Sequence, residues 1–277
     1  MHEEARAFVI GYPIAHSRSP LIHRFWLEQL RTMGSYDRLE VLPDALSEFV
    51  KQMRAKKWRG CNVTIPHKQA IMDLVDDVSP EARHIGAANT LWFDDDQLKA
   101  TNTDAYGFAA NMDDYAPRWK SAKTCLIIGA GGAARAVIYA CRQVGIGSIT
   151  IVNRTTTKAE KLSEDFDVQA ADMTEALRDI SPFELIINTT SAGMGDISPL
   201  PIDFKSAQSA AIAADIVYAP LNTQFLLSAR AHGLHTVDGL GMLLHQAVPG
   251  FEKWFGRRPK VNLPLRRLIL SDLGEPT

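Results

Sequence analysis

An apolar segment that ends in closely spaced glycines and continues into an alanine-rich stretch constrains this chain most. It reads Leu126-Ile-Ile-Gly-Ala-Gly-Gly-Ala-Ala-Arg-Ala136, and a second apolar segment, 148–152, follows. The pattern predicts a strand, a tight turn, a helix and a second strand. Gly129 and Gly131 permit the turn and the close approach of a pyrophosphate, and the small Ala134 lets helix and strand pack. We therefore expect a dinucleotide at the N-terminal end of this helix.

The residues after the second apolar segment indicate which dinucleotide. At this place an NAD site usually has an acidic residue for the ribose 2′-OH. This chain has Asn153 and Arg154, with Lys158 one helical turn further on. A cation suits a 2′-phosphate, so NADP is the predicted cofactor. The alternatives are an ordinary strand–helix connection and a methyltransferase, and Arg154 argues against the second because that class normally has an acid here.

Composition and charge favour a globular protein of two domains and give no sign of a nucleic-acid or membrane partner. The chain has 277 residues, 46% of them hydrophobic, and a formal net charge of −2, so we expect two domains with sizeable cores. Near-zero charge gives no reason to expect nucleic acid or an anionic membrane as a partner. No apolar run approaches the roughly 20 residues of a membrane span. The first residues lack a signal-peptide core, which favours a cytoplasmic protein.

The cysteines and histidines give no indication of a metal site. Three cysteines, Cys61, Cys125 and Cys141, are odd in number and lack metal-binding spacing. They are expected to be buried, reduced thiols, as in a cytoplasmic protein. His232 and His235 are three residues apart, but without a third ligand they are expected to be surface histidines.

The residues before the glycine turn predict a first α/β domain, 1–105. Strands are expected over 7–12, 36–42 and 60–65, and a hairpin over 88–93 and 98–100. Helices are expected to start at Ser19-Pro20, with Ser19 as N-cap, at Asp44 as a cap, and at Pro66. This βαβαβ order with an appended hairpin predicts a mostly parallel sheet.

The remainder predicts a Rossmann-type, doubly wound domain over 106–238. A helix after Asp104 leads into it, and further strands are expected over 185–189, 211–217 and 235–237. Past Gly239 the chain has helical spacing of apolar residues. We expect these C-terminal helices, within 239–277, to pack back on the first domain, which would make that domain discontinuous.

Polar side chains that follow predicted strands are candidates for substrate binding, because ligands bind at the carboxyl ends of parallel strands. After the first strand come Ser17 and Ser19, whose hydroxyls at a helix N-terminus would suit a carboxylate or a phosphate. The alternative is that Ser19 is only a helix cap and Ser17 only a loop residue.

Lys68 is a candidate for proton transfer. It follows Asn62 and Thr64, which alternation places on one face of the third strand, and it stands at a predicted helix start, where a positive charge opposes the helix dipole. Partial desolvation there would lower its pKa towards a range useful for proton transfer. The alternative is an exposed surface lysine.

Asn89 and Asp104 follow later strands and complete the polar set. Asp104 could simply cap the following helix. Together with Lys68, however, it would form the Lys–Asp pair that a hydride-transfer enzyme needs, since the cofactor takes the hydride and a side chain takes the hydroxyl proton.

The chain resembles the shikimate dehydrogenase family through most of its length. The matching segments, in order, are 11–20 (GYPIAHSRSP), 62–68 (NVTIPHK), 86–90 (GAANT), 102–107 (NTDAYG), 129–136 (GAGGAARA), 153–155 (NRT), 188–194 (NTTSAGM), 215–220 (DIVYAP) and 239–247 (GLGMLLHQA). The resemblance implies reversible, NADPH-dependent reduction of 3-dehydroshikimate to shikimate in aromatic amino-acid and chorismate biosynthesis. Oligomeric state stays open between monomer and homodimer.

The resemblance also implies residue roles. Lys68 and Asp104 would be the catalytic pair, with Lys68 exchanging the proton. The residues implied to bind substrate are Ser17, Ser19, Thr64, Asn89, Asp104, Tyr218 and Gln246. Those implied to bind NADP(H) are Gly129, Ala130, Gly131, Gly132, Ala133, Asn153, Arg154, Thr155, Lys158, Thr189, Val217, Gly239 and Met242.

Two departures and two alternatives accompany the resemblance. Lys158 stands where Arg is common, which keeps the charge but loses a bidentate fork. His245 precedes Gln246 where an apolar residue is frequent, and no role is assigned to it.

A quinate/shikimate dehydrogenase that uses NAD or both cofactors would share the fold, but it would favour an acid near Arg154. A non-catalytic, ligand-sensing regulator could lose Lys68 or Asp104, and both are present.

Overall fold

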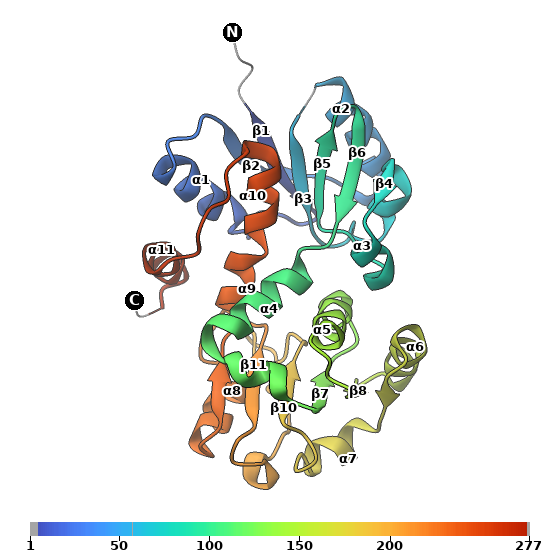
Figure 1. Ribbon diagram of the computed structural model, residues 1–277, viewed down its shortest axis with the longest axis vertical. Coiled ribbons are helices and arrows are strands. Elements are labelled where there is room, and N and C mark those ends of the chain that lie inside the picture. The colour runs from blue at the N-terminus through green and yellow to red at the C-terminus, as the bar shows by residue number, and fades with distance from the viewer. Residues whose placement is uncertain (1–4, 57, 276–277) are drawn as a thin grey trace. The chain divides into compact units, whose positions relative to one another are not determined.

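The computed structural model describes residues 5–56 and 58–275, which form two compact units (Figure 1). The first unit contains the residues up to Thr103 together with Leu244–Asp272, and the second contains Asp104–Leu243 and a few residues from Leu273. The chain therefore leaves the first unit at Thr103 and returns to it at Leu244.

The first unit is a six-stranded sheet with helices. Its strands are β1 (Arg6–Gly11), β2 (Ser35–Glu40), β3 (Gly60–Val63), β4 (Asp77–Val78), β5 (Thr90–Asp94) and β6 (Gln97–Thr101). Its helices are α1 (Ser19–Gln29), α2 (Leu46–Ala55), α3 (Pro80–Ile85), α10 (Ala247–Phe255) and most of α11 (Leu263–Leu273). The strand order is β2-β1-β3-β5-β6-β4, and only β5 pairs antiparallel with its neighbours. The expected mostly parallel sheet with a hairpin is confirmed.

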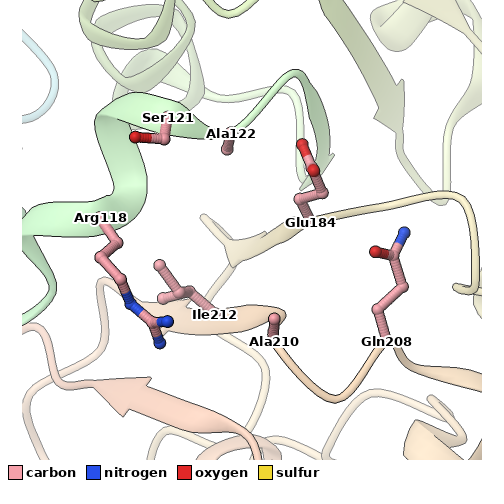
Figure 2. Close-up of a pocket in the computed structure, with 7 residues that line it drawn as sticks. All are labelled: Arg118, Ser121, Ala122, Glu184, Gln208, Ala210 and Ile212. Carbon is pink, nitrogen blue, oxygen red and sulfur yellow. The ribbon is translucent and has the colours of Figure 1, made fainter.

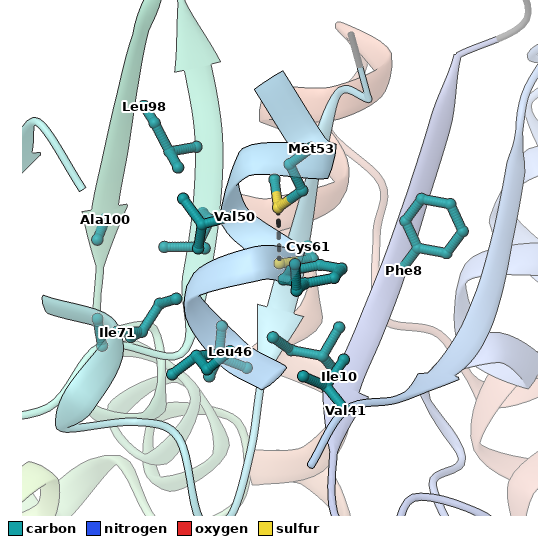
Figure 3. Close-up of a cluster of buried hydrophobic side chains, with 14 of the residues drawn as sticks. Phe8, Ile10, Val41, Leu46, Val50, Met53, Cys61, Ile71, Leu98 and Ala100 are labelled. Atoms are coloured by element: carbon teal, nitrogen blue, oxygen red, sulfur yellow. Dashed lines mark hydrogen bonds between the residues drawn. The ribbon is translucent and has the colours of Figure 1, made fainter. Parts of the chain in front are cut away.

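Apolar side chains at helical spacing hold α2 against this sheet (Figure 3). Leu46, Val50 and Met53 lie on one face of α2 and pack with Phe8 and Cys61 in one buried cluster. The Cys61 thiol lies 3.8 Å from the Met53 sulfur, and burial raises the pKa of this thiol. Cys61 is therefore an inert core residue, as expected from the sequence.

The C-terminal helix α10 packs in the same unit against α1, β3 and β5. An aromatic cluster marks this contact, in which the His23 ring stacks on Tyr36 at 3.9 Å between centroids and on Phe251 at 5.8 Å. The Trp26 indole also donates to the carbonyl of Lys260 at 3.1 Å. The expected return of C-terminal helices to the first domain is confirmed.

The second unit is a parallel sheet in the order β12-β11-β10-β7-β8-β9. Its strands are β7 (Thr124–Ile128), β8 (Ser148–Val152), β9 (Gln169–Ala170), β10 (Leu185–Asn188), β11 (Ile212–Asp215) and β12 (His235–Val237). Its helices are α4 (Asp104–Tyr115), α5 (Gly132–Gln143), α6 (Thr156–Phe166), α7 (Met173–Arg178), α8 (Gln224–Ala231) and most of α9 (Leu240–His245). Numbered within the unit, this order is 6-5-4-1-2-3, the dinucleotide-binding arrangement, so the predicted fold class is confirmed.

Two predicted helix starts are wrong in detail. Ser19 is already inside α1, because Leu21 and Ile22 both donate to the carbonyl of Arg18, which is the residue that precedes the helix. Asp44 lies within a single 3₁₀ turn, Pro43–Ala45, inserted before α2. Residues with capping propensity predict that a helix begins nearby, but the first turn is chosen by packing of the whole element.

Candidate active site

In the first unit, the predicted site residues gather where strands end at one edge of the sheet. The strand register places the ends of β1 and β3 together, and it pairs Asn62 with Thr90 and Thr90 with Thr101. The loop after β1, the segment after β3 and the residues around Asn89 and Thr103 therefore lie at the same edge. This is the edge at which open α/β sheets bind ligands.

Ser17 and Ser19 lie at the start of α1 and contact each other. The backbone N–H of Ser19 faces the Ser17 hydroxyl at 3.4 Å, and the Arg38 guanidinium donates to the carbonyl of Ser17 at 2.8 Å. Ser19 is buried, with 7% of its surface exposed, whereas Ser17 is half-buried. The Ser17 hydroxyl and Ser19 thus lie at the first turn of an eleven-residue helix, whose unpaired N–H groups favour an anion.

Lys68 lies in a turn, and the prediction that a helix starts at Pro66 is wrong. The segment is fastened to neighbouring strands: Thr64 donates to the carbonyl of Ile10 at 2.9 Å, and Ala88 donates to the carbonyl of Lys68 at 2.8 Å. The next helical turn is a 3₁₀ turn over Ala70–Leu74. The backbone groups of the segment bond to the sheet, so the helix-dipole argument for Lys68 does not apply. Its side chain is half-buried.

The Asn89 side chain is held by hydrogen bonds to its amide oxygen. Asn89 Oδ1 accepts from the Thr103 N–H at 2.8 Å and from the Thr90 hydroxyl at 3.0 Å. The Thr103 hydroxyl lies 3.1 Å from the same oxygen and 2.8 Å from the carbonyl of Gln246. Asn89 and Gln246, far apart in the sequence, are therefore brought together through Thr103. These bonds fix the orientation of the Asn89 amide, with Oδ1 towards Thr90 and Thr103 and Nδ2 as its donor end.

A buried chain of hydrogen bonds behind these residues was not predicted from the sequence. The Tyr36 hydroxyl donates to Asn62 Oδ1 at 2.6 Å, and Asn62 Nδ2 donates to Thr90 Oγ1 at 3.1 Å. Burial raises the pKa of Tyr36 well above its usual value, and the Ser19 hydroxyl partly opposes this shift. The polar Asn62 within an apolar strand is the sequence feature that indicates such a chain, since a buried polar group needs a hydrogen-bond partner.

Asp104 is the first residue of α4 and therefore belongs to the second unit. It is buried, with 9% of its surface exposed. An acid in the first turn of a helix is favoured by the dipole, so its position suits both a structural and a chemical role.

The predicted cofactor residues lie at the carboxyl edge of the second sheet. The register aligns Ile128 with Val152 and with Asn188, and Asn188 with Asp215, so the residues that follow these four strands are neighbours. Gly129, Asn153, Thr189 and the segment with Val217 and Tyr218 follow them. The structure thus brings the predicted turn, 2′-phosphate and nicotinamide residues of this unit to one edge.

The glycine turn has the form that a pyrophosphate needs. Gly129 has φ +114°, and a Cβ there would lie 2.6 Å from Thr189 Oγ1, so glycine is required at this point. Gly131 precedes α5 and Gly132 is its first residue. Both are exposed, and a Cβ at either would meet no atom of the described residues within 4 Å. The space in front of the helix N-terminus is therefore open to a phosphate, and the turn fits a dinucleotide.

Arg154 and Lys158 are exposed beside the N-terminus of α6. Asn153 Nδ2 donates to the carbonyl of Thr155 at 2.9 Å and so shapes the turn that presents them. The first turn of α6 carries no acidic residue. Two cations and a positive helix end together make this point attractive to a dianion.

Asp215 fixes the segment that carries Val217 and Tyr218, and its role was missed. Its carboxylate accepts from Asn188 at 3.0 Å, from the Thr223 hydroxyl at 2.7 Å and from the Val217 N–H at 3.0 Å. Burial raises the pKa of Asp215, and these hydrogen bonds oppose the shift. Beyond this segment, Gly239 donates to the carbonyl of Val217 at 3.3 Å, and Met242 is buried in α9.

A cavity of about 190 Å³ in the second unit lies at the opposite edge of the sheet (Figure 2). Its lining residues include Ile212, which begins β11, and Ala122 and Glu184, which precede β7 and β10. Glu184 accepts from the Thr124 N–H at 3.3 Å and thus serves the start of β7. The cavity is at the amino ends of the strands, opposite the carboxyl edge that carries the predicted cofactor residues of this unit.

Comparison with known proteins identifies the family. The profile of the shikimate dehydrogenase substrate binding domain matches residues 9–91, that of shikimate / quinate 5-dehydrogenase matches 113–198, and that of the shikimate 5′-dehydrogenase C-terminal domain matches 239–263. Shikimate dehydrogenase (NADP(+)) of Brucella abortus is 50% identical over 275 residues, covering 98% of this chain and 95% of that protein. This chain belongs to the shikimate dehydrogenase family.

Solved structures of the family have the same fold. The Thermus thermophilus shikimate 5-dehydrogenase, solved with NADP(H) and shikimate, is 37% identical with a TM-score of 0.86, covering 95% of this chain and 98% of that one. Quinate dehydrogenase from Corynebacterium glutamicum, solved with NAD, is 28% identical with a TM-score of 0.89, covering 97% and 99%. The family resemblance predicted from the motifs is confirmed.

None of the helices within 5–56 and 58–275 is long and apolar enough to span a membrane. Over the same residues, no group of three or more His, Cys, Asp and Glu side chains could hold a metal ion.

Proposed function

We infer that this chain catalyses the reversible reduction of 3-dehydroshikimate to shikimate with NADPH, a step of chorismate and aromatic amino-acid biosynthesis. The observation that carries this conclusion is 50% identity over 98% of the chain to an NADP(+)-dependent shikimate dehydrogenase. The open glycine turn and the exposed cations after β8 support the same cofactor.

We propose that the first unit is the substrate domain and the second the NADP domain. Ser17, Ser19 and Thr64 would hold the substrate carboxylate, and Tyr218 is a further candidate for binding the substrate. Asn89 and Gln246 would bind ring hydroxyls together with Asp104. The hydrogen bonds that hold Asn89 Oδ1 fix the orientation of this amide.

The chemistry is a hydride transfer balanced by a proton transfer. When bound, NADPH supplies a hydride to the carbonyl carbon. The Lys68 ammonium gives a proton to the carbonyl oxygen, so the ketone becomes an alcohol and neutral Lys68 regains its proton from solvent. Asp104, hydrogen-bonded to the same region of the substrate, keeps the reacting hydroxyl oriented. In the reverse direction Lys68 takes the hydroxyl proton.

The cofactor residues divide into three groups along NADP(H). Residues Gly129, Ala130, Gly131, Gly132 and Ala133 would hold the pyrophosphate. Asn153, Arg154, Thr155 and Lys158 would hold the adenosine 2′-phosphate. Thr189, Val217, Gly239 and Met242 would line the nicotinamide half.

The deciding experiment is an absorbance assay at the NADPH band with shikimate and quinate, each offered with NADP⁺ and with NAD⁺. We expect strong turnover only with shikimate and NADP⁺. Comparable turnover with quinate or NAD⁺ would instead assign the chain to the dual-substrate branch of the family. No turnover from folded protein would favour the ligand-sensing regulator.

Location and assembly belong to this proposal as well. We expect a cytoplasmic enzyme that is a monomer or a homodimer. All three cysteines are free and buried, which suits a reducing compartment. Light scattering coupled to size-exclusion chromatography distinguishes the two assemblies, and a mass above that of a dimer would contradict both.

A further inference from the structure

Asn111 is a buried amide on α4 that bonds to the residue directly before the Gly239–Met242 segment. Only 3% of its surface is exposed, and its Nδ2 donates to the carbonyl of Asp238 at 2.7 Å. Its Oδ1 is buried with no hydrogen-bond partner among the residues that the structure describes. An unpaired buried acceptor costs free energy of folding, a cost that an apolar side chain at this position would avoid.

The Asn111 side chain packs very closely against Gly241. A Cβ at Gly241 would lie 1.8 Å from Asn111 Oδ1. A Cβ at Gly239 would likewise lie 2.2 Å from the carbonyl oxygen of Ile216. The segment is thus clamped between α4 on one side and the end of β11 on the other, and both glycines are required by this close approach.

α4 joins this clamp to the candidate catalytic acid. Asp104 is the first residue of α4, and Asn111 follows seven residues later on the same helix. Seven residues are two turns, so the two side chains lie on one side of the helix, about 10 Å apart along its axis. One rigid element therefore carries Asp104 at its start and the anchor of the Gly239–Met242 segment two turns later.

We propose that Asn111 is a positioning residue that sets the nicotinamide half of NADP(H) relative to Asp104. The inference rests on the proposed function, in which Gly239 and Met242 contact the nicotinamide half. Asn111 acts through the segment and not on the cofactor itself. Its loss should therefore disturb one half of the cofactor and leave the other half bound.

Binding of two ligands by calorimetry tests this division. NADP⁺ carries both halves, whereas 2′,5′-ADP carries only the adenosine half with the 2′-phosphate. For Asn111→Asp and Asn111→Ala we expect the Kd of NADP⁺ to rise about 5- to 20-fold, as for a lost buried hydrogen bond. The Kd of 2′,5′-ADP should stay within about twofold. Equal weakening of both ligands, or of neither, would overturn the proposal.

The matched control is Asn222→Ala, an exposed asparagine of the same unit whose side chain accepts from Arg230 at 3.2 Å. It should leave both dissociation constants unchanged. Thermal unfolding of the apo variants accompanies the binding measurements, so that a variant that fails to fold is recognised and the Asn111→Asp form, nearly identical in shape, is used in its place.

A double-mutant cycle tests the contact with Gly241 independently of the cofactor. Gly241→Ala alone should lower the Tm, because its Cβ meets Asn111 Oδ1. Asn111→Ala combined with Gly241→Ala should recover much of that loss, so the two effects should not add. Additive effects on Tm would contradict the clamp.

Steady-state kinetics separate this inference from the proposed function. If the wild-type protein oxidises shikimate with NADP⁺ and Asn111→Asp does so with unchanged kcat and unchanged NADP⁺ affinity, only the positioning role fails. If the wild-type protein binds neither shikimate nor NADP⁺, the proposed function fails. We expect Asn111→Asp to lower kcat about 10-fold or more while the KM of shikimate stays within about twofold.

Discussion

The indole Nε1 of Trp254 donates to the carbonyl oxygen of Leu91 at 2.7 Å and so joins α10 to β5, although the two residues are 163 positions apart in the sequence. The same indole lies over Gly60 of β3, where a Cβ would be 2.2 Å from Nε1 and 2.1 Å from the Leu91 oxygen. Gly60 also has φ +158°. The return of the C-terminal helix to the sheet thus depends on a glycine and a tryptophan that face each other.

Gly60→Ala should destabilise the protein by about 3 kcal/mol or more, because the new methyl group meets both a backbone oxygen and the indole. Trp254→Phe should cost about 1–3 kcal/mol through the lost hydrogen bond. Urea unfolding measures both. Gly147→Ala is the control, since a Cβ there meets no atom of the described residues within 4 Å. Equal stability of Gly60→Ala and Gly147→Ala would contradict the contact.

Lys68→Ala should lower kcat by roughly 10²–10⁴ with little change in the KM of shikimate, as expected for loss of a general acid–base. Initial-rate kinetics at saturating NADP⁺ measure this change. Lys51→Ala, which removes an exposed lysine near Glu48, is the matched control. A Lys68→Ala enzyme with near wild-type turnover would remove Lys68 from the mechanism.

Arg154→Ala should raise the KM of NADP⁺ by about 10-fold or more and leave the KM of NAD⁺ nearly unchanged, because only NADP⁺ carries the 2′-phosphate. The measurement is the ratio of kcat/KM for the two cofactors, with Arg178→Ala of α7 as an exposed control. If both cofactors lose affinity equally, the cation serves the fold of the turn and not the phosphate.

Gly129→Ala and Gly131→Ala should fail in different ways. Gly129 has a positive φ and packs on Thr189, so alanine there should lower the Tm. Gly131 has an extended backbone and open space, so alanine should leave the Tm within about 2 °C while it weakens NADP⁺ binding about 10-fold by blocking a phosphate. A stable Gly131→Ala variant that binds NADP⁺ as tightly as the wild type would contradict the proposed phosphate site.

His23 should make stability sensitive to acid. Burial lowers its pKa from 6.5 to about 3, against a smaller opposing effect of Asn62, so the folded protein keeps this ring neutral. Between these values the unfolded chain binds more protons, and stability falls as the pH decreases, by about 1.4 kcal/mol per pH unit.

His23→Phe should remove this contribution, which amounts to about 2 kcal/mol between pH 7 and pH 5. Urea unfolding at the two pH values gives the difference, and His232→Asn, at an exposed position, should retain the wild-type dependence. The same pH dependence in His23→Phe and in the wild type would show that His23 is accessible to protons in the folded state.

Local pattern was enough to predict the strand, turn and helix around Gly129, because alternation, glycine spacing and small residues act within about twenty positions. It could not predict β4, because a two-residue strand is too short to show alternation and is defined only by its pairing with Lys99 and Ala100. It also misplaced the helix start at Pro66, since bonds to Ile10 and Ala88 hold that segment. Contacts between distant residues decide such points, and spacing alone does not reveal them.

In the candidate site, too, local pattern predicted some features and contacts between distant residues decided others. Polar residues after strands marked Ser17, Lys68, Asn89 and Asp104 as candidates without any knowledge of the fold. The partners that orient them, such as Thr103 for Asn89, depend on strand register. Asn111 was missed because a single amide in a helix gives no signal until the glycine opposite it is known.

The division of the first unit between both ends of the chain has a consequence for synthesis on the ribosome. Residues 104–243 emerge as one continuous stretch and can fold while translation proceeds. The first sheet emerges earlier but lacks α10, and with it the Trp254 indole over Gly60, until residues 247–255 are made. The half of the protein that is synthesised first is therefore expected to be completed last, and its uncovered aromatic face is the surface that a nascent-chain chaperone would meet.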